Sequence, residues 1–243
     1  MMSISIPSAI AVWAAFFANA NAAPTAPPKP AYEPTDRYET RVIEGWTILT
    51  HRGFLESQPE LAAQTFELLR FQLYQTARVV PAPALAKLKQ IKIWVEEAEP
   101  HHPCMAYHPD PGWLRDHDMN PAKARCVEIA NARTFLDWTK AQPWMVLHEL
   151  AHGYHHQFLQ DSFGNAAVAA AQGKAKASGT YNQALHIDGR RREAYALTNP
   201  MEYFAESSEA YFGTNDFFPF VRSELQHSDA EGFKLMKEMW SLP

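Results

Sequence analysis

The sequence has 243 residues, a length that suits one domain, and 47% hydrophobic residues, with 12% aromatic residues available for a core. The formal net charge is −5, so there is no reason to expect nucleic acid or an anionic membrane as a partner. It has no run of about 18 uninterrupted apolar residues, so no membrane-spanning helix is expected.

Residues 1–23 have the layout of a secretory signal peptide. They contain no charged side chain, and an apolar run from Ala9 to Ala18 leads into two overlapping Ala-Asn-Ala triplets that are typical of a cleavage site. Basic residues are missing before the apolar run, so a buried N-terminal helix or an uncleaved anchor is the alternative. We expect a signal peptide over 1–22, a Pro-rich linker over 23–37, and a protein that is secreted or periplasmic.

From Tyr38 to residue 243 the patterns predict a single α+β domain. Residues 41–51 and 91–97 are rich in β-branched and apolar residues, which indicates strands. Residues 59–78 begin with proline and carry apolar residues at helical spacing, which indicates a helix. Helix and strands together give the first part of the domain an α+β character, and helical patterns dominate after residue 143.

The sequence contains only two cysteines, Cys104 and Cys126, in or beside an irregular Pro- and His-rich stretch over 98–122. In an oxidising compartment an isolated pair is expected to form a disulfide, which would close a loop of about twenty residues and contribute about 3 kcal/mol. A second metal site within "HHPCMAYH", residues 101–108, is the alternative, although the spacing matches no standard ligand pattern.

A central helix is predicted over 143–160, and it contains "HELAH". His148 and His152 are four residues apart and so share one helix face, where both imidazoles can bind one zinc ion at about 2.1 Å. Glu149 can then face a zinc-bound water without binding the metal, which suits a general base. The motif lies in an apolar frame, and polar residues within a buried helix need a partner such as a metal.

Two further histidines, His155 and His156, follow the motif. The metzincin class of metallopeptidases would require glycine at position 155 and histidine at position 158, where this sequence has histidine and phenylalanine. That class is therefore disfavoured. We interpret His155 and His156 as residues that support the site or lie on the surface, and not as zinc ligands.

A third zinc ligand must come from elsewhere in the chain, because catalytic zinc usually has three protein ligands and one open position. Asn199 and Pro200 predict the start of a helix, along which Glu202, Glu206 and Glu209 share one face. A solvated acidic stripe is the alternative interpretation. Spacing alone does not choose between Glu202 and Glu206, and the two could divide the roles of ligand and of acceptor for the outer nitrogen of a ligand histidine.

These residues resemble a known group of enzymes. His148-Glu149-x-x-His152, followed about fifty residues later by Glu202-x-x-x-Glu206, resembles the gluzincin zinc metallopeptidases. Tyr195 together with "NPMEYFAE" is similar to the catalytic domain of the anthrax lethal factor and Pro-Pro endopeptidase group. The resemblance extends over roughly residues 140–215, and the N-terminal part matches only in general character.

The resemblance implies a zincin-like fold, with a small mixed sheet and the active-site helix in an N-terminal lobe and a mainly helical C-terminal lobe. It implies one Zn²⁺ per chain, with His148, His152 and Glu202 as ligands and Glu149 as general base. It also makes Tyr195 the group that stabilises the oxyanion or protonates the leaving group, although a packed aromatic residue is the alternative for this position. Glu206 would be the acidic partner of the first zinc histidine.

The function expected from these residues is that of a secreted zinc-dependent endopeptidase, a monomer that acts on peptides or proteins. Another zinc hydrolase would share the same residues. A zinc-binding structural or interaction protein without turnover is the alternative from a different class, against which Glu149 and Tyr195 argue, because a structural site needs neither. An extended substrate could add to a strand edge, for which residues 126–131 are the candidate. "RRRE", residues 190–193, could line a cleft or form a solvated turn.

Overall fold

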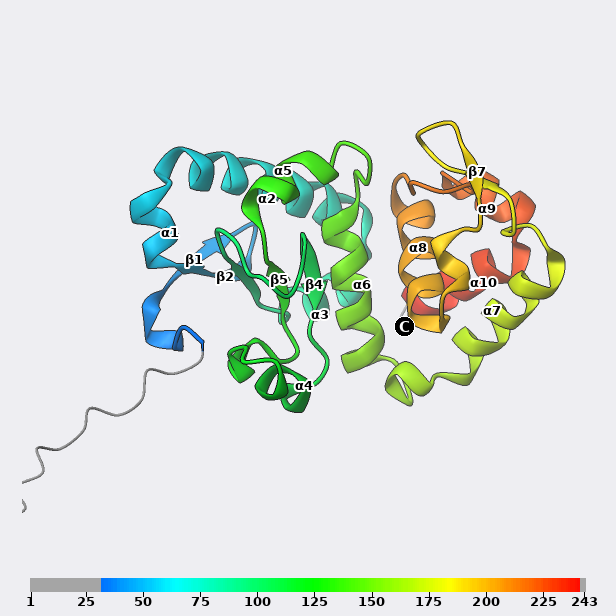
Figure 1. Ribbon diagram of the computed structural model, residues 1–243. Coiled ribbons are helices and arrows are strands. Elements are labelled where there is room, and N and C mark those ends of the chain that lie inside the picture. The colour runs from blue at the N-terminus through cyan, green and yellow to red at the C-terminus, as the bar shows by residue number, and fades with distance from the viewer. Residues whose placement is uncertain (1–31, 241–243) are drawn as a thin grey trace, which may run out of the picture. The chain divides into compact units, whose positions relative to one another are not determined.

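The computed structural model describes residues 32–240, whose helices and strands are shown in Figure 1. The predicted signal peptide and most of the predicted linker lie outside the described residues, and the predicted domain limits stay a prediction. The short 3-10 helix η1 (Thr35–Arg37) precedes the first strand. Within the described part of the chain, no helix is long and apolar enough to cross a membrane.

Five strands form a mixed sheet in the order β1-β2-β3-β5-β4. The hairpin of β1 and β2 is antiparallel, β2, β3 and β5 are parallel to one another, and β4 is antiparallel to β5. The segment predicted as one strand over 41–51 is divided between β1 and β2, because Glu44 and Gly45, with φ of 51° and 88°, form a turn within it. The strands span Tyr38–Ile43 (β1), Trp46–His51 (β2), Ile93–Val95 (β3), Met105–Tyr107 (β4) and Val127–Ile129 (β5).

The two faces of the sheet take part in different clusters, because successive side chains of a strand point to opposite sides. Ile48 and Ile93 belong to the main hydrophobic core, whereas Leu49 and Trp94 belong to a smaller cluster. The helix predicted over 59–78 is confirmed as α2. The helices of this part are α1 (Arg52–Ser57), α2 (Pro59–Val79), α3 (Ala82–Leu88), α4 (Pro111–Asp116), α5 (Ala132–Trp138) and α6 (Met145–Phe158), and the 3-10 helix η2 spans Pro121–Lys123.

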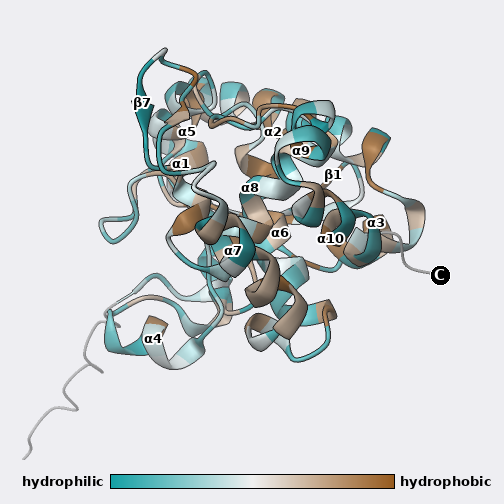
Figure 2. Ribbon diagram, turned by 90° about the vertical axis from the view of Figure 1, so that its right-hand side faces the viewer, coloured by the Kyte–Doolittle hydropathy of each residue, from teal (hydrophilic) through white to brown (hydrophobic). Residues whose placement is uncertain are grey.

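After α6 the chain is mainly helical, and α8 packs along α6 (Figure 1). Hydrophilic and hydrophobic residues are mixed along these helices (Figure 2), as expected for helices with one buried face. The predicted α+β class, with a small mixed sheet and a mainly helical second part, is confirmed. The elements are η3 (Ser162–Gly164), α7 (Ala166–Ser178), β6 (Ala184–Leu185), β7 (Arg191–Arg192), η4 (Tyr195–Leu197), α8 (Pro200–Phe212), α9 (Arg222–Ser228) and α10 (Ala230–Trp240).

The prediction that residues 126–131 form an open strand edge is wrong. β5 pairs with β3 on one side and with β4 on the other, so it lies inside the sheet. Glu128 of this strand is fully buried, and its carboxylate contacts Lys123 and His108. The strand at this end of the sheet is β4, in the stretch that was predicted to be irregular.

The predicted disulfide is also wrong, because Cys104 and Cys126 are both free thiols. In the β4–β5 pair, Cys104 lies beyond one end of the paired residues and Cys126 beyond the other. The two positions are four residue steps apart along the strands, which is about 13 Å at roughly 3.3 Å per residue. A disulfide requires its Cα atoms to lie within roughly 7 Å of each other. Sγ of Cys104 instead lies 3.4 Å from Sδ of Met145.

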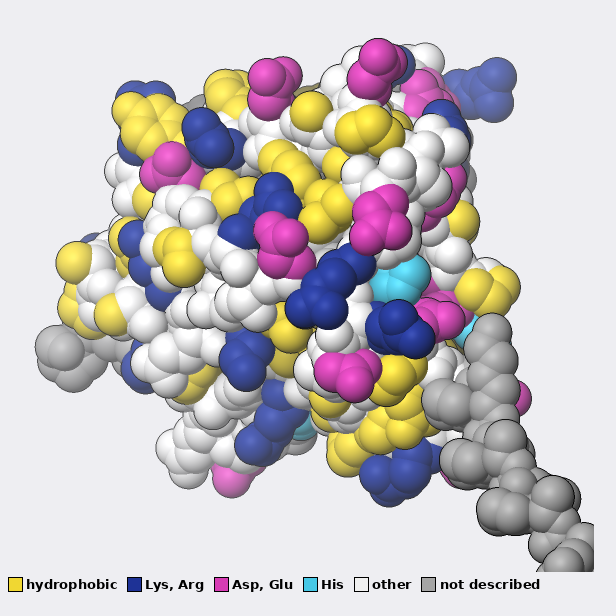
Figure 3. All heavy atoms as spheres, turned by 90° about the vertical axis from the view of Figure 1, so that its left-hand side faces the viewer, with side chains coloured by type: hydrophobic (Ala, Val, Ile, Leu, Met, Phe, Trp, Pro, Cys, Tyr) yellow, Lys and Arg dark blue, Asp and Glu magenta, His cyan; other side chains and the backbone are white. Residues whose placement is uncertain are grey.

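The surface on the side of β1 and α1 carries charges of both signs. In Figure 3, which faces this side, lysine and arginine side chains are interspersed with acidic ones. Such mixing is typical of a solvated surface.

Candidate metal centre

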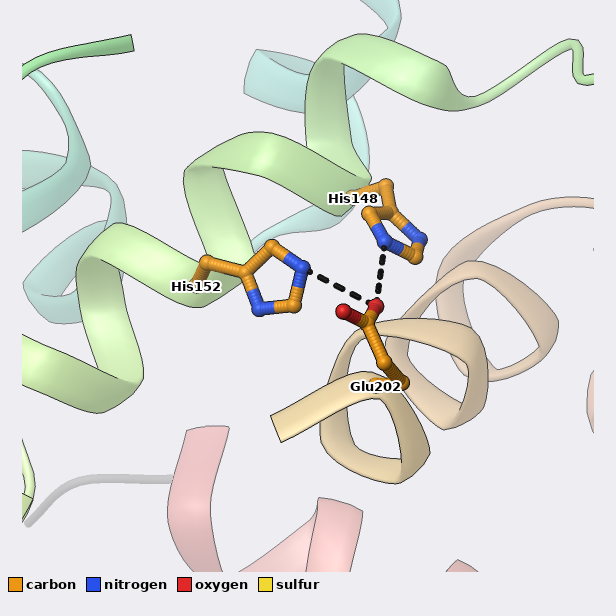
Figure 4. Close-up of side chains that lie close together, drawn as sticks. All are labelled: His148, His152 and Glu202. Carbon is orange, nitrogen blue, oxygen red and sulfur yellow. Dashed lines mark hydrogen bonds and ion pairs between the residues drawn. The ribbon is translucent and has the colours of Figure 1, made fainter. Parts of the chain in front are cut away.

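Helix α6 carries the "HELAH" segment through the core. Leu147 and Ala151 are fully buried, as the apolar frame of the motif predicts. Gly153 allows the helix to approach its neighbours closely, because a Cβ atom at this position would lie 2.6 Å from Cδ1 of Ile91 and 3.1 Å from Cε2 of Tyr107. The helix is therefore fixed against the sheet, and its histidine-bearing face meets α8 (Figure 4).

Helix α8 places Glu202 between the two histidines of the motif. Asn199 caps this helix, since its side-chain oxygen accepts hydrogen bonds from the backbone amides of Met201 and Glu202, both at 2.9 Å. Oε2 of Glu202 lies 3.1 Å from Nε2 of His148 and 3.2 Å from Nε2 of His152 (Figure 4). The structure therefore brings together the three side chains that were predicted as ligands.

The spacing of these three atoms suits a tetrahedral metal. Ligand atoms bound at about 2.0–2.1 Å in a regular tetrahedron lie roughly 3.3–3.4 Å apart, and the two measured N–O distances are 3.1 and 3.2 Å. Two imidazoles and one carboxylate are a donor set that zinc prefers. Within residues 32–240, both groups of three side chains that could hold a metal include His148, and neither includes a residue of 101–108.

The outer nitrogen of His148 is held by Glu209, and not by Glu206 as predicted. Nδ1 of His148 lies 2.7 Å from Oε1 of Glu209 but 4.0 Å from Oε1 of Glu206. The two nitrogen atoms of the His148 ring point in different directions, so the two carboxylates that contact them must lie well apart along α8. Seven residues of helix rise about 10 Å, whereas four residues rise about 6 Å, so Glu209 reaches the far side of the ring when Glu202 occupies the near side.

This hydrogen bond fixes the orientation of the ring, and the orientation suits metal binding. A proton on Nδ1 that is donated to Glu209 leaves Nε2 with a free lone pair directed at the site. Burial lowers the pKa of His148, but Glu202 and Glu209 outweigh this effect and raise the pKa well above its ordinary value. Burial has the opposite effect on Glu202 and raises its pKa, but hydrogen bonds from the two histidines hold the pKa of this carboxyl far below its usual range. The carboxylates thus favour positive charge at this place, which a divalent cation supplies.

The three side chains open onto a cleft of about 630 Å³. Glu149 and Tyr195, the two predicted catalytic residues, both line this cleft. Tyr195, in η4, is 48% exposed, and its ring centroid lies 6.5 Å from that of His148. Partial burial and the charge of Glu202 raise the pKa of Tyr195, so its hydroxyl keeps its proton at neutral pH and can donate a hydrogen bond. Strand β4 also lines the cleft.

His155 and His156 lie away from the three ligand atoms. His155 is fully buried, with its ring centroid 5.2 Å from that of Phe163 and 5.0 Å from that of Phe204. His156 supports β4, because its Nδ1 atom lies 2.8 Å from the hydroxyl of Tyr107.

The sequence interpretation missed two residues that line the cleft, His186 and Asp216. They come from the β6–β7 hairpin and from the loop after α8, and Nε2 of His186 lies 3.4 Å from Oδ2 of Asp216. Neither residue belongs to a motif, so no local signal points to them.

Comparison with known proteins adds one distant similarity. No known protein family and no curated protein matches the sequence. Among solved structures, the fold is similar to that of a Pro-Pro endopeptidase (PPEP-2) from Paenibacillus alvei, with 18% identity, 69% of this chain and 86% of that chain covered, and a TM-score of 0.39.

Proposed function

We propose that the protein is a zinc-dependent endopeptidase. The observation that carries the proposal is the position of Oε2 of Glu202, which lies within 3.2 Å of Nε2 of both His148 and His152. These three ligand atoms face a cleft that also contains Glu149 and Tyr195. A structural zinc site normally has four protein ligands and no need for an open cleft, so the arrangement favours catalysis over the alternative of a structural or interaction protein.

In this proposal the side chains of the cleft divide the chemistry between them. A bound zinc ion would lower the pKa of a water molecule and polarise a carbonyl oxygen. Glu149, as general base, would accept a proton from the attacking water and return it to the leaving amine. Tyr195 would donate a hydrogen bond to the carbonyl oxygen as negative charge develops on it. Glu209 would keep Nε2 of His148 directed at the site.

The strand beside the cleft supports a peptide as the substrate. β4 is the last strand of the sheet, and residues Met105–Tyr107 line the cleft. An extended peptide could pair with the free edge of such a strand through its backbone. β4 thus takes the role that was predicted for residues 126–131. The proposal that the protein is secreted rests on the sequence of residues 1–23 alone.

The decisive experiment compares the wild type with Glu149→Gln. We expect about one zinc ion per chain in both proteins and cleavage of a random peptide pool by the wild type. The substitution should lower the rate by about 10²–10⁴-fold, the usual contribution of a general base. A wild-type protein that contains one zinc ion per chain, but cleaves no peptide in the pool, would instead favour the structural alternative.

A further inference from the structure

Because Nδ1 of His148 bonds Glu209, Glu206 makes no hydrogen bond to this histidine. Glu206 is 2% exposed and lines the cleft. Its Oε2 atom accepts a hydrogen bond from Nδ2 of Asn215 at 3.1 Å. Its Oε1 atom makes no hydrogen bond within residues 32–240, and Nδ1 of His148, at 4.0 Å, already bonds Glu209. One oxygen of a buried carboxylate is thus free at the wall of the cleft.

Asp216 lines the same cleft and also has a free oxygen. Its Oδ2 atom lies 3.4 Å from Nε2 of His186, whereas Oδ1 is buried and has no hydrogen-bond partner in the described structure. The backbone fixes this residue, because the carbonyl of Asp216 accepts a hydrogen bond from the amide of Ile187 at 2.8 Å. Nδ1 of His186 lies 3.0 Å from Asp188, so this imidazole serves two carboxylates.

The charges around the cleft do not balance. The described residues that line the cleft include five acidic residues. They include one basic residue of the lysine or arginine type, Arg192. The guanidinium of Arg192 is already used, since it lies 3.2 Å from Asp188 and 5.3 Å from the ring centroid of Phe217. A metal ion bound to Glu202 would leave Glu206 without a lysine or arginine partner, and Asp216 would have only the imidazole of His186, which also contacts Asp188. Partly buried carboxylates are costly unless a counter-charge reaches them.

We propose that Glu206 and Asp216 form a subsite for a cationic group of the peptide substrate, either a lysine or arginine side chain or the free amino terminus. Both sources offer N–H donors with a positive charge, which form the stronger class of hydrogen bonds with carboxylates. Met145 and Phe217 line the same cleft and provide apolar surface for the carbon atoms next to such a group. This inference rests on the proposed peptidase function, because it assumes that the occupant of the cleft is a peptide.

Three peptide pools of equal length test the inference and identify the source of the charge. The first is acetylated at its amino terminus and contains norleucine at the varied positions. The second is acetylated and has lysine in place of norleucine. The third has norleucine and a free amino terminus. We expect the wild type to cleave either the second or the third pool with a kcat/KM about tenfold above that of the first, which corresponds to one good charged hydrogen bond.

The variants Glu206→Gln and Asp216→Asn should bring this ratio close to one. Glu193→Gln is the matched control, because Glu193 also lines the cleft but is exposed, and its loss should leave the ratio unchanged. Zinc content and thermal melting of each variant show that the site and the fold persist. Equal cleavage of all three pools by the wild type, or a ratio that neither variant lowers, would overturn the inference.

A binding measurement separates this inference from the proposed function. Calorimetry with zinc-loaded Glu149→Gln compares an acetylated lysine peptide, its norleucine counterpart and the norleucine peptide with a free amino terminus. Tighter binding of one cationic peptide supports the subsite if the gain in affinity disappears in the double variant Glu149→Gln with Asp216→Asn. This support holds even if the wild type cleaves no peptide. Equal binding of all three peptides contradicts the subsite, and cleavage of the neutral pool would then leave the peptidase proposal standing.

Discussion

Replacement of Glu209 by methionine tests the assignment of this residue as the partner of His148. Methionine keeps the length of the side chain but removes the charged acceptor. The hydrogen bond to Nδ1 of His148 is 2.7 Å long, and both side chains are almost fully buried. Loss of an acceptor that orients a ligand histidine typically weakens metal binding about 10–100-fold. Burial places the expected effect in the upper part of that range, about 30–100-fold or roughly 2–2.7 kcal/mol.

Glu206→Met is the matched comparison. It also removes one buried carboxylate from α8, but Glu206 lies 4.0 Å from Nδ1 of His148 and makes no hydrogen bond with it. Both variants replace a buried glutamate of α8 near the candidate metal site by methionine, so the difference between them reports the hydrogen bond. We expect Glu209→Met to weaken zinc binding about tenfold more than Glu206→Met does.

The assay is a zinc competition titration against a chromophoric chelator at constant pH and salt. Thermal melting of the metal-free proteins shows whether each variant is folded. A larger loss of zinc affinity in Glu206→Met would mean that Glu206 holds the histidine, and the described register of α8 against α6 would then be refuted.

Four other outcomes follow from the structure. Glu202→Ala should lower zinc affinity by more than the roughly 100-fold limit typical of supporting residues, and a larger loss in Glu206→Ala would show that the third ligand is misassigned. Thiol titration of unreduced, denatured protein should find two free thiols, whereas none would indicate a disulfide. Burial lowers the pKa of His155 to about 4, so the unfolded state binds more protons than the folded state between pH 4 and about 6.5. The free energy of unfolding should therefore rise with pH in this range, by up to about 3 kcal/mol. His155→Phe should flatten this pH dependence in melting curves. A Cβ atom at Gly213 would lie 1.9 Å from Cε2 of Trp144, so Gly213→Ala should destabilise the fold by about 1–3 kcal/mol or more in denaturant titration, and an unchanged midpoint would contradict this packing.

Local patterns predicted the parts of the site that depend on one helix at a time. The four-residue spacing of His148 and His152 was enough to place both on one face of α6. Asn199 correctly predicted the start of α8, because its side chain caps that helix. These features were accessible because capping and periodicity depend only on residues close in sequence.

The errors concern relations between elements. The choice between Glu206 and Glu209 depends on how far α8 extends past the ring of His148, which follows from helix packing and not from spacing. The strand at 127–129 was misplaced because the order of strands, which puts β5 between β3 and β4, does not follow from local sequence. The failed disulfide has a similar cause, since strand register and not sequence separation decides whether two cysteines can meet.

Helix α8 carries three different tasks on one face, and this makes its position critical. Glu202 meets both His148 and His152, Glu209 holds Nδ1 of His148, and Glu206 lies between these two glutamates and lines the cleft. A shift of one residue along the helix would turn each side chain by about 100° and separate all three from their partners. The cap at Asn199 and the close contact of Gly213 with Trp144 fix the two ends of α8. The candidate metal centre therefore depends on residues outside the His148–His152–Glu202 group and the cleft-facing carboxylates.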